Sequence, residues 1–459
     1  MGRQSTVTPD TLGREVLFCR TGNPFVDSGI AALCVLSGRK TPEEITRDDL
    51  RTQMEYIIQL YSDGDWKKAI HGMFFPNADL VNPSVKDGMG RYATTMEELL
   101  NAASSIHGRG DCVACGRRDG IFIDKTRVPL LGSQKLVNFF PAGSPGERFC
   151  PNCILASQFH LLAVEKVGIP LMLQCSKWEI QLAYARRIVN RVRTNHAMKR
   201  GGVVDDGFGK PAGLNAVYNA ITEIIQDRDI GVTEDPVPLR FYHFTNYGQG
   251  PEIDMYDIPA SVFLFLMEVE KSPNRNDWKK IVARGLEYVK RPKADTPKRS
   301  PNEVYQRLTE GKSILRFFIQ KDRTVIGDWN LVSLYLRVVR GMSRERIETI
   351  RRVADQLLEF AMDSGSARRI WEIDSARTYD AFRTALVKVQ AEMAKKMGRP
   401  LLTFDEYTLD IAPEGGASWR ETRDLILFRV YERGASWLAN VPERPHLTED
   451  QEEEYEEEE

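Results

Sequence analysis

Apolar side chains recur at helical spacing close to the start of the chain. They follow one another at steps of four, three and four residues, which predicts an amphipathic helix with one buried face. The residues of this stripe are Leu50, Met54, Ile57 and Tyr61. Just before it, Thr41, Pro42 and Glu44 have the order of an N-cap residue, a first-turn proline and a capping-box glutamate. We therefore expect the helix to begin at Pro42.

Helical periodicity is strongest after Met342. Two long apolar stripes follow that residue, and a third segment begins with a capping box formed by Ser418 and Glu421. The stripe residues are Ile347, Ile350, Val353, Leu357 and Phe360, then Tyr379, Phe382, Leu386, Val389, Met393 and Met397, and then Leu425 and Phe428. These patterns predict a C-terminal α-helical bundle over residues 342–448, separable from a body over residues 1–341.

The body mixes strand and helix patterns. Strands are expected at residues 14–20, 128–132, 135–140 and 241–245. Helices are expected after the turn at residues 22–29 and from Ile154 to Val164, and residues 63–127 show so little periodicity that loops are expected there. The chain is therefore assigned to the α+β class, with a mixed N-terminal region and a helical C-terminal bundle.

Two CxxC pairs stand out within the body, Cys112 with Cys115 and Cys150 with Cys153. Each tight CxxC turn can aim two thiolates at one point, so two such turns can provide a closed tetrahedral shell for Zn²⁺. Because four cysteines leave no open coordination position, we expect a structural zinc that staples the insertion at about residues 105–155. Redox chemistry and chance pairing are the alternatives.

Composition describes an ordinary protein with enough apolar residues for sizeable cores. The chain has 459 residues, of which 42% are hydrophobic, and it contains no apolar run long enough to cross a membrane. The N-terminus lacks the apolar core of a signal peptide, and the three remaining cysteines, Cys19, Cys34 and Cys175, lie in apolar runs. We therefore expect a cytoplasmic protein that has no membrane partner.

Charge is distributed unevenly along the chain. The net charge is −2, but the tail from Glu449 to Glu459 is almost entirely acidic, so the body is mildly basic. The tail at residues 449–459 is expected to be disordered and solvated. Competition of this tail with nucleic acid for a basic groove is a second possibility.

Two basic stretches are candidate contacts for a nucleic-acid backbone. Residues 180–204 carry no acid, and their cations alternate with apolar residues, as expected for a helix with one apolar and one cationic side. A solvated helix, or one paired with acids elsewhere, is the alternative. A second basic stretch, residues 271–299, is an equally good candidate for a solvated loop. The candidate cations are Arg186, Arg187, Arg191, Arg193, Lys199, Arg200, Lys290, Arg291 and Lys293.

An aromatic run at residues 241–245 leads into the turn Asn246-Tyr247-Gly248-Gln249-Gly250. Glycines allow close approach of the backbone to a ligand, and amide side chains can both donate and accept hydrogen bonds. These groups suit the reading of base edges or the wedging of a duplex. A structural hairpin is the alternative.

Four features together resemble the large subunit of type I-B CRISPR effector complexes (Cascade), in the variety named for its CXXC-CXXC pairs. They are the GNPFVDSGIAAL segment at residues 22–33, the two cysteine pairs, the NYGQGP turn at residues 246–251 and the C-terminal helical bundle. The resemblance covers most of the chain, and its specific motifs are the cysteines and the turn.

The resemblance implies a non-catalytic subunit that takes part in antiviral defence. Such a subunit recognises the protospacer-adjacent motif (PAM) in duplex DNA, helps to open the duplex, stabilises the R-loop and docks a recruited helicase-nuclease. Its implied partners are crRNA, double-stranded target DNA with its displaced strand, the backbone and small subunits of Cascade, and the helicase-nuclease or a transposition adaptor.

The resemblance also suggests roles for particular residues, because guide pairing reads most of the sequence and the protein needs a short base-reading element and cationic tracks. Asn246, Gln249, Tyr247 and Gly248 are the candidates for PAM contact, and Asn23 and Phe25 for contact with the 5′ handle of the crRNA. The bundle can be made separately in this family from an internal start, a position that Met342 fits.

No reactive constellation is visible in the sequence. The six histidines form no HExxH motif or HNH-like cluster, and the acids Asp254 and Asp257 lack further metal-binding residues nearby. We therefore expect no enzymatic activity. The alternative function is a stand-alone zinc-ribbon nucleic-acid-binding protein in transcription or RNA processing, which would bind without a guide RNA.

Overall fold

The computed structural model describes residues 16–75, 78–103, 111–118, 120–131, 147–227, 237–246, 252–287, 293–320, 322–413 and 417–441. The chain divides into two compact units. The first comprises Met1–Phe263 and Val289–Tyr305, and the second comprises Leu264–Tyr288 and Gln306–Glu459. The expected boundary at 341/342 lies inside the second unit, so the separate folding of residues 342–448 stays a prediction.

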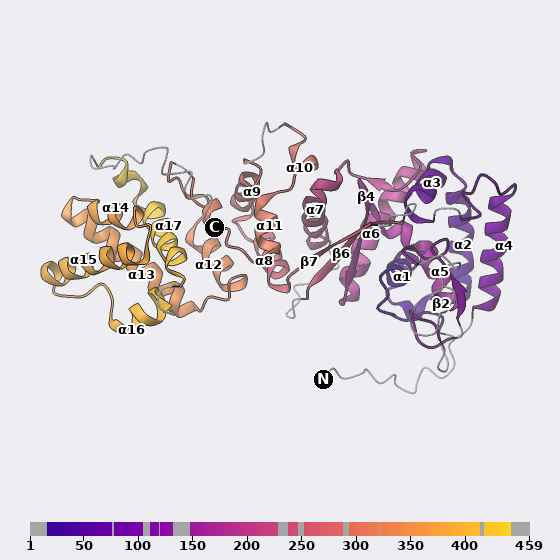
Figure 1. The fold of residues 1–459 in the computed structure, drawn as a ribbon, viewed down its shortest axis with the longest axis horizontal. Helices are drawn as coiled ribbons and strands as arrows, with labels where there is room; N and C mark the ends of the chain where they lie inside the picture. The colour runs from indigo at the N-terminus through magenta and orange to yellow at the C-terminus, as the bar shows by residue number, and fades with distance from the viewer. Residues whose placement is uncertain are drawn as a thin grey trace. The chain divides into compact units, whose positions relative to one another are not determined.

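The first unit contains a sheet, a two-stranded ribbon and most of the short helices (Figure 1). Its elements are α1 (Pro24–Ser37), η2 (Pro42–Glu44), α2 (Arg47–Tyr61), α3 (Gly64–Ala69), η3 (Ile70–Phe74), α4 (Gly88–Ala102), β1 (Ile121–Ile123), β2 (Glu147–Phe149), α5 (Pro151–Phe159), η4 (His160–Ala163), β3 (Glu165–Val167), β4 (Ile169–Cys175), α6 (Trp178–Ala197), β5 (Val204–Asp205), η5 (Lys210–Ala212), α7 (Gly213–Ile225), β6 (Leu239–Thr245), β7 (Glu252–Ile258) and α10 (Thr296–Arg299).

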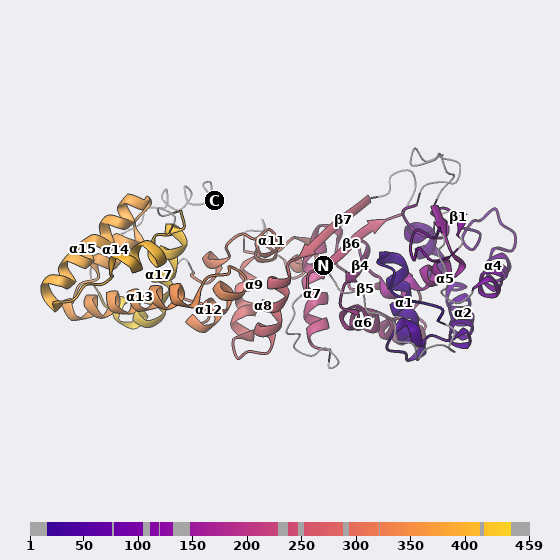
Figure 2. The ribbon, with the colours of Figure 1, turned by 90° about the horizontal axis from the view of Figure 1, so that it is seen from below.

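The five-stranded sheet has the order β5-β3-β4-β6-β7, and its neighbours pair antiparallel except for β3 and β5. Side chains alternate between its faces. On one face Phe241 of β6 packs edge-on against Tyr184 of α6, and on the other face Phe244 packs against Phe25 of α1. The core of the unit therefore lies on both sides of the central strands, while the β6–β7 hairpin extends beyond β4 (Figure 2).

Helix α1 is the central apolar helix of this unit. Asn23 caps it by accepting hydrogen bonds from the backbone N–H groups of Phe25 and Val26, and Gly38 ends it in the left-handed conformation. Its middle is buried all round, and Gly29 lets α1 pack directly on the backbone of α5 at Ala156. This helix therefore joins the sheet to the segment that carries the second cysteine pair.

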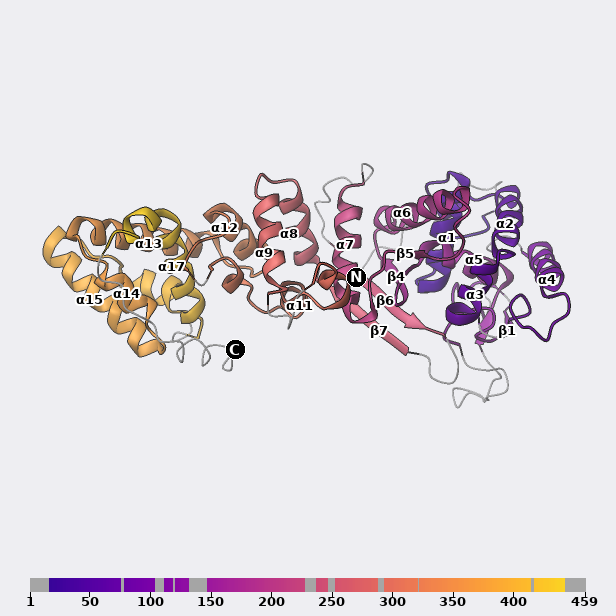
Figure 3. The same ribbon diagram turned by 90° about the horizontal axis from the view of Figure 1, so that it is seen from above.

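The second unit is helical (Figure 3). Its helices are α9 (Arg275–Arg284), η6 (Leu315–Phe317), α12 (Trp329–Val338), α13 (Arg344–Ser364), α14 (Arg368–Asp374), α15 (Tyr379–Met397), α16 (Phe404–Glu406), η7 (Tyr407–Ile411) and α17 (Trp419–Leu438). Helices α8 (Ala260–Glu270) and α11 (Glu303–Thr309) contain the division between the units. None of the described helices has the length and apolar content needed to cross a membrane.

The predicted bundle stripes are largely buried, as expected. The buried members are Ile347, Ile350, Val353, Leu357, Phe360, Phe382, Leu386, Val389, Met393, Leu425 and Phe428. The predicted capping box of α17 was wrong, because Ser418 makes no side-chain capping bond. Its hydroxyl accepts a hydrogen bond from Arg346, and Glu421 pairs with Arg340.

Several local predictions in the body were also wrong. The helix expected from Pro42 begins at Arg47, where Thr46 and Asp49 form the capping box and Pro42 belongs to a short 3₁₀ turn. Residues 16–20 form no strand, and residues 63–127 contain α3, η3 and α4, which their weak periodicity concealed. Residues 128–131 form turns rather than a strand, and the strand expected at 135–140 lies outside the described residues.

Candidate metal centre and nucleic-acid interface

A short antiparallel ribbon supports the two cysteine pairs. Strands β1 and β2 pair Ile121 with Phe149 and Ile123 with Glu147. The first CxxC turn docks on this ribbon, because the Val113 N–H donates to the Arg148 carbonyl at 2.9 Å. Gly116, at a φ of 65°, lets the turn close with a 2.7 Å bond to the Cys112 carbonyl.

The second pair occupies the start of α5. Cys150 is the residue before the helix, Pro151 takes the first helical position and Cys153 lies in the first turn. Asn152, between the cysteines, is buried and donates from its side chain to the Leu17 carbonyl at 2.8 Å. The second CxxC turn thus also holds the N-terminal segment in place.

The fold brings all four cysteines together. Their Sγ atoms lie within 4.8 Å of one another, and the Cys115 and Cys150 sulfurs are 3.8 Å apart. A regular tetrahedron of Zn–S bonds requires a sulfur separation of roughly 3.8 Å. Cys112, Cys150 and Cys153 are buried and Cys115 is partly exposed, so the cluster can hold a metal ion, consistent with zinc, in a closed shell.

The four thiols lie close enough to shift the pKa values of one another. Hydrogen bonds from Cys115, Cys150 and Cys153 hold the pKa of Cys112 far below its usual value. Hydrogen bonds to Cys112, Cys115 and Cys150, with burial, raise the pKa of Cys153 well above its usual value. The Cys112 thiolate therefore suppresses the ionisation of Cys153, and a divalent cation would supply the positive charge that four thiolates need.

The side chain of Asn246, the first residue of the predicted base-reading turn, is buried inside the protein. It is 1% exposed, and its amide nitrogen donates to the carbonyls of Phe74 at 2.5 Å and Lys125 at 3.1 Å. Its amide oxygen accepts from the Leu130 N–H at 3.0 Å. In this arrangement Asn246 cannot reach a base edge, because its amide is used inside the protein, and the role of the rest of the turn stays a prediction. Tyr247, Gly248 and Gln249 lie outside the described residues.

The arginines in the middle of α6 are engaged in ion pairs. Arg186 binds Asp227 through two 3.0 Å bonds, and Arg191 binds Asp206 at 2.8 Å. Arg187 contacts Glu165, Asp206 and Glu223, and its side chain is 9% exposed. The alternative of pairing with acids elsewhere therefore holds for these three residues, since the acids come from other parts of the same unit.

The cations around the end of α6 face solvent. Arg193, Lys199 and Arg200 are exposed, although Arg193 also donates to the Leu36 carbonyl at 3.1 Å. Lys293, from the second basic stretch, is exposed as well, and Lys290 and Arg291 lie outside the described residues. Backbone contact through these exposed cations stays a prediction.

The two residues expected at the crRNA handle have internal roles in this structure. Asn23 uses its side chain to cap α1, and Phe25 is 7% exposed among the rings of His160 and Phe244. The Phe25 side chain is therefore buried, whereas Asn23 is partly exposed. Their proposed contact with RNA is untested.

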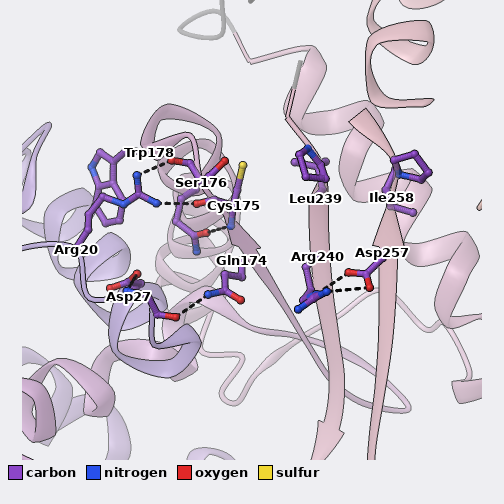
Figure 4. A pocket seen from close by; sticks show the side chains of 14 residues that line it. Arg20, Asp27, Gln174, Cys175, Ser176, Trp178, Leu239, Arg240, Asp257 and Ile258 are labelled. Carbon is purple, nitrogen blue, oxygen red and sulfur yellow. Dashed lines mark hydrogen bonds and ion pairs between the residues drawn. The ribbon is translucent and has the colours of Figure 1, made fainter. Parts of the chain in front are cut away.

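Sequence reasoning missed a cleft beside these residues. It is lined by Arg20, Gln174, Arg240 and Asp257 among others, and has a volume of about 480 Å³ (Figure 4). Three of these side chains occupy one row of the sheet, where Gln174 of β4 pairs with Arg240 of β6 and Arg240 with Asp257 of β7. No local pattern signals the row, because it exists only once the strands are in register.

Comparison with known proteins gives one match. Residues 106–164, which contain all four cysteines, match a family described as CRISPR-associated protein (Cas_CXXC_CXXC). No curated protein and no solved structure matches the chain significantly. Over this segment the chain is therefore similar to CRISPR-associated proteins.

Proposed function

We propose, from the likeness of residues 106–164 to CRISPR-associated proteins, that this protein is the large, non-catalytic subunit of a crRNA-guided type I-B surveillance complex. In this role it recognises the PAM in duplex DNA, helps to open the duplex, stabilises the R-loop and docks a helicase-nuclease. The observation that carries the proposal is the folding of the matched segment into one four-cysteine site.

The described surface is compatible with a backbone contact. Exposed Lys199 and Arg200 follow the end of α6, and a cationic surface can contact phosphates whatever the base sequence. The guide would then supply most of the sequence recognition through base pairing. Asn246, being buried, is not part of this proposal, and the PAM-reading residues are sought among the remaining residues of the hairpin turn.

The non-catalytic assignment is part of the same proposal. Asp257, one of two acids considered for a two-metal site, is held by Arg240 through bonds of 2.6 and 3.0 Å. Within the described residues the four cysteines are the one cluster found that could hold a metal ion. A closed shell of four thiolates gives a metal no open position for chemistry.

Assembly is the decisive test. The full chain is coexpressed with a repeat-derived guide RNA and the backbone subunits of a type I-B complex, and the purified complex is tested on duplexes that differ only in the flank of the target. We expect copurification with the guide and a preference for one short flank. Binding without a guide and with no preference for a flank would instead indicate the zinc-ribbon alternative.

Charge variants sharpen this experiment. Lys199→Gln with Arg200→Gln is expected to weaken duplex binding about equally for all flanks and to lower the salt dependence, by roughly one counterion for each lost phosphate contact. Lys86→Gln with Arg91→Gln removes two exposed cations near the start of α4 and serves as the control. Equal effects of the two double variants would contradict a specific track at the end of α6.

A further inference from the structure

The cleft beside the start of α1 is built from parts of the chain that are distant in sequence. Figure 4 shows Arg20 and Asp27 on one side, Arg240 and Asp257 on the other, and Gln174 between them. The apolar part of the lining includes the exposed Pro238, the partly exposed Pro259 and the edge of Trp178, whereas the paired residues Leu239 and Ile258 border the cleft but are fully buried. The cleft thus combines polar walls with an apolar surface.

Arg20 is fixed in place on its side of the cleft. Its guanidinium donates to the carbonyls of Ser176 at 2.5 Å and Cys175 at 3.0 Å, and it lies 5.7 Å from the centre of the Trp178 ring. Because these two carbonyls are uncharged, they orient the guanidinium without cancelling its charge. A guanidinium has five N–H donors, so two bonds do not exhaust it.

Asp27 does not neutralise this charge by direct pairing. It is 5% exposed, and its carboxylate accepts hydrogen bonds from the Thr21 N–H, the Thr21 hydroxyl and the Gly22 N–H at 2.8 to 2.9 Å. Its bonding capacity is therefore used to shape the turn before α1. Arg20 is exposed and lines the cleft, with its guanidinium turned towards the Ser176 and Cys175 carbonyls.

Arg240, in an ion pair with Asp257, forms the opposing wall. Its side chain is 48% exposed and is oriented by Asp257, whose side chain is 59% exposed. Between the two walls, Gln174 donates to the Gly22 carbonyl at 2.8 Å and accepts from the Tyr242 hydroxyl at 2.7 Å, which fixes the orientation of its amide. The cleft is thus preorganised by contacts made within the protein.

We propose that this cleft holds one nucleotide of a single-stranded nucleic acid between the walls of Arg20 and Arg240, with the phosphate on Arg240 and the base against the apolar part of the lining. The arginine fork matches phosphate oxygens, and a volume of about 480 Å³ suits a ligand of this size. A small carboxylate ligand would pair with the arginine side chains but would leave the apolar lining of the cleft exposed to water. The inference rests on the proposed function, since it names the class of partner at one further site.

Two single variants with opposite expected effects provide the test. Arg240→Gln removes a cation and is expected to weaken binding about tenfold, whereas Asp257→Asn removes the acid that partly neutralises Arg240 and is expected to strengthen it about threefold. Binding is measured by fluorescence anisotropy with the full chain and fluorescein-labelled octanucleotides, one of RNA and one of DNA with the same sequence. A larger effect on either probe identifies the preferred strand.

A matched control and a competitor complete the design. Lys166→Gln and Asp205→Asn alter an ion pair of comparable exposure that does not line the cleft, so both should leave binding unchanged. A nucleoside 5′-monophosphate should displace the probe at lower concentration than glutamate. Thermal unfolding of each variant shows whether its fold is retained.

Three outcomes would overturn the inference. The first is unchanged affinity in both cleft variants, or absence of binding by the wild-type chain. The second is weaker binding in both variants together with lower thermal stability, which would indicate a structural role for the ion pair. The third is equal displacement by glutamate and by the nucleotide. None of these would decide the proposed function, because copurification with a guide RNA is measured independently.

Discussion

Asn246 shows how one amide can serve the interior of a protein at a position where the sequence suggests a ligand contact. It directly follows β6, and its side chain joins the carbonyls of Phe74 and Lys125 to the N–H of Leu130. These partners belong to η3 and to the segment between the two cysteine pairs. A buried amide with three hydrogen bonds holds three separate segments of backbone together.

The structural role of Asn246 predicts a large loss of stability on truncation. Asn246→Ala should lower the free energy of unfolding by about 2–4 kcal/mol, because it removes three hydrogen bonds and leaves buried backbone groups without partners. Asn219→Ala, which removes a more exposed amide bonded to Glu223, should cost less than about 0.5 kcal/mol. Denaturant unfolding of the two variants measures both values, and similar losses would contradict the proposed role.

His160 is a second residue whose environment has consequences for the whole chain. It is fully buried among the rings of Phe25, Phe74 and Phe75, and its Nδ1–H donates to the Ser157 carbonyl. No hydrogen-bond partner for Nε2 is present among the described residues. Burial lowers the pKa of His160 to about 4, and the bond to Ser157 opposes this only in part.

This lowered pKa predicts a loss of stability in mild acid. Between pH 6.5 and about 4 the unfolded chain binds a proton at His160 that the folded chain does not, so the free energy of unfolding falls as the pH falls through this range. The loss should be on the order of 3 kcal/mol. His160→Asn keeps a donor near the position of Nδ1 and should flatten this part of the curve; parallel curves for variant and wild type would exclude His160 as the cause.

At the scale of elements, the contact of α1 with α5 positions the candidate metal centre. A Cβ at Gly29 would lie 1.8 Å from the Ala156 carbonyl oxygen, which is far inside van der Waals contact. Glycine is therefore required for two helices to approach so closely at this point. Because α5 also begins with the second cysteine pair, this packing fixes the pair relative to the sheet.

The close approach predicts a strong effect from one added methyl group. Gly29→Ala should lower the free energy of unfolding by about 3 kcal/mol or more, since the clash is with backbone rather than with a flexible side chain. Gly64→Ala provides a control, because a Cβ there would meet nothing within 4 Å. That variant should be neutral or slightly stabilising by urea denaturation, and a tolerated Gly29→Ala would show that the two helices can move apart.

The β1–β2 ribbon and the two CxxC turns form the candidate metal centre, whose metal content can be measured directly. We expect one equivalent of zinc per chain by elemental analysis, and a loss of most of it in Cys153→Ser because a three-thiolate shell holds the ion less firmly. Cys34→Ala, which alters a buried cysteine of α1 outside the cluster, should retain the metal. Metal-free wild-type protein with unchanged stability would rule out a structural zinc.

At the scale of the whole molecule, the packing inside the second unit is relevant to the prediction that the bundle after Met342 can be made as a separate protein. The Trp329 N–H donates to Glu432 at 2.7 Å, and the rings of Trp329 and Phe318 lie about 6 Å from the ring of Phe428. Phe428 is 1% exposed. The bundle after Met342 therefore shares part of its core with residues that precede it in the same unit.

This shared core predicts that a chain starting at Met342 is weakened. A fragment of residues 342–459 should remain helical but unfold with a free energy about 3 kcal/mol lower than that of residues 306–459, because Phe428 loses its aromatic neighbours. Trp329→Ala in the longer fragment should remove much of the difference. Equal urea midpoints for the two fragments would instead support the boundary predicted from the sequence at 341/342.

Much of the architecture could be predicted from local patterns. The apolar stripe from Leu50 to Tyr61 and the stripes of the C-terminal bundle follow helical spacing, and their burial confirms those predictions. Helix α4 was missed because its buried residues, Tyr92, Met96, Leu99 and Leu100, follow a glycine-rich start in a stretch with few apolar residues. The start of α2 was predicted too early because both Thr41 and Thr46 are suitable capping residues, and Thr46 is the one that caps the helix.

The sequence by itself determined the metal-binding potential of this protein, because CxxC spacing is a local property and two such turns carry all the ligands. It also determined the helical character of the C-terminal part, through periodicity. Only the tertiary structure decided which charged residues pair with one another. The acids that form ion pairs with Arg186, Arg187 and Arg191 come from positions 165, 206, 223 and 227. Likewise, Gln174, Arg240 and Asp257 lie in one row only because of the register of their strands. A charged side chain can meet a partner from any part of the chain, so its role is fixed by folding and not by its neighbours in sequence.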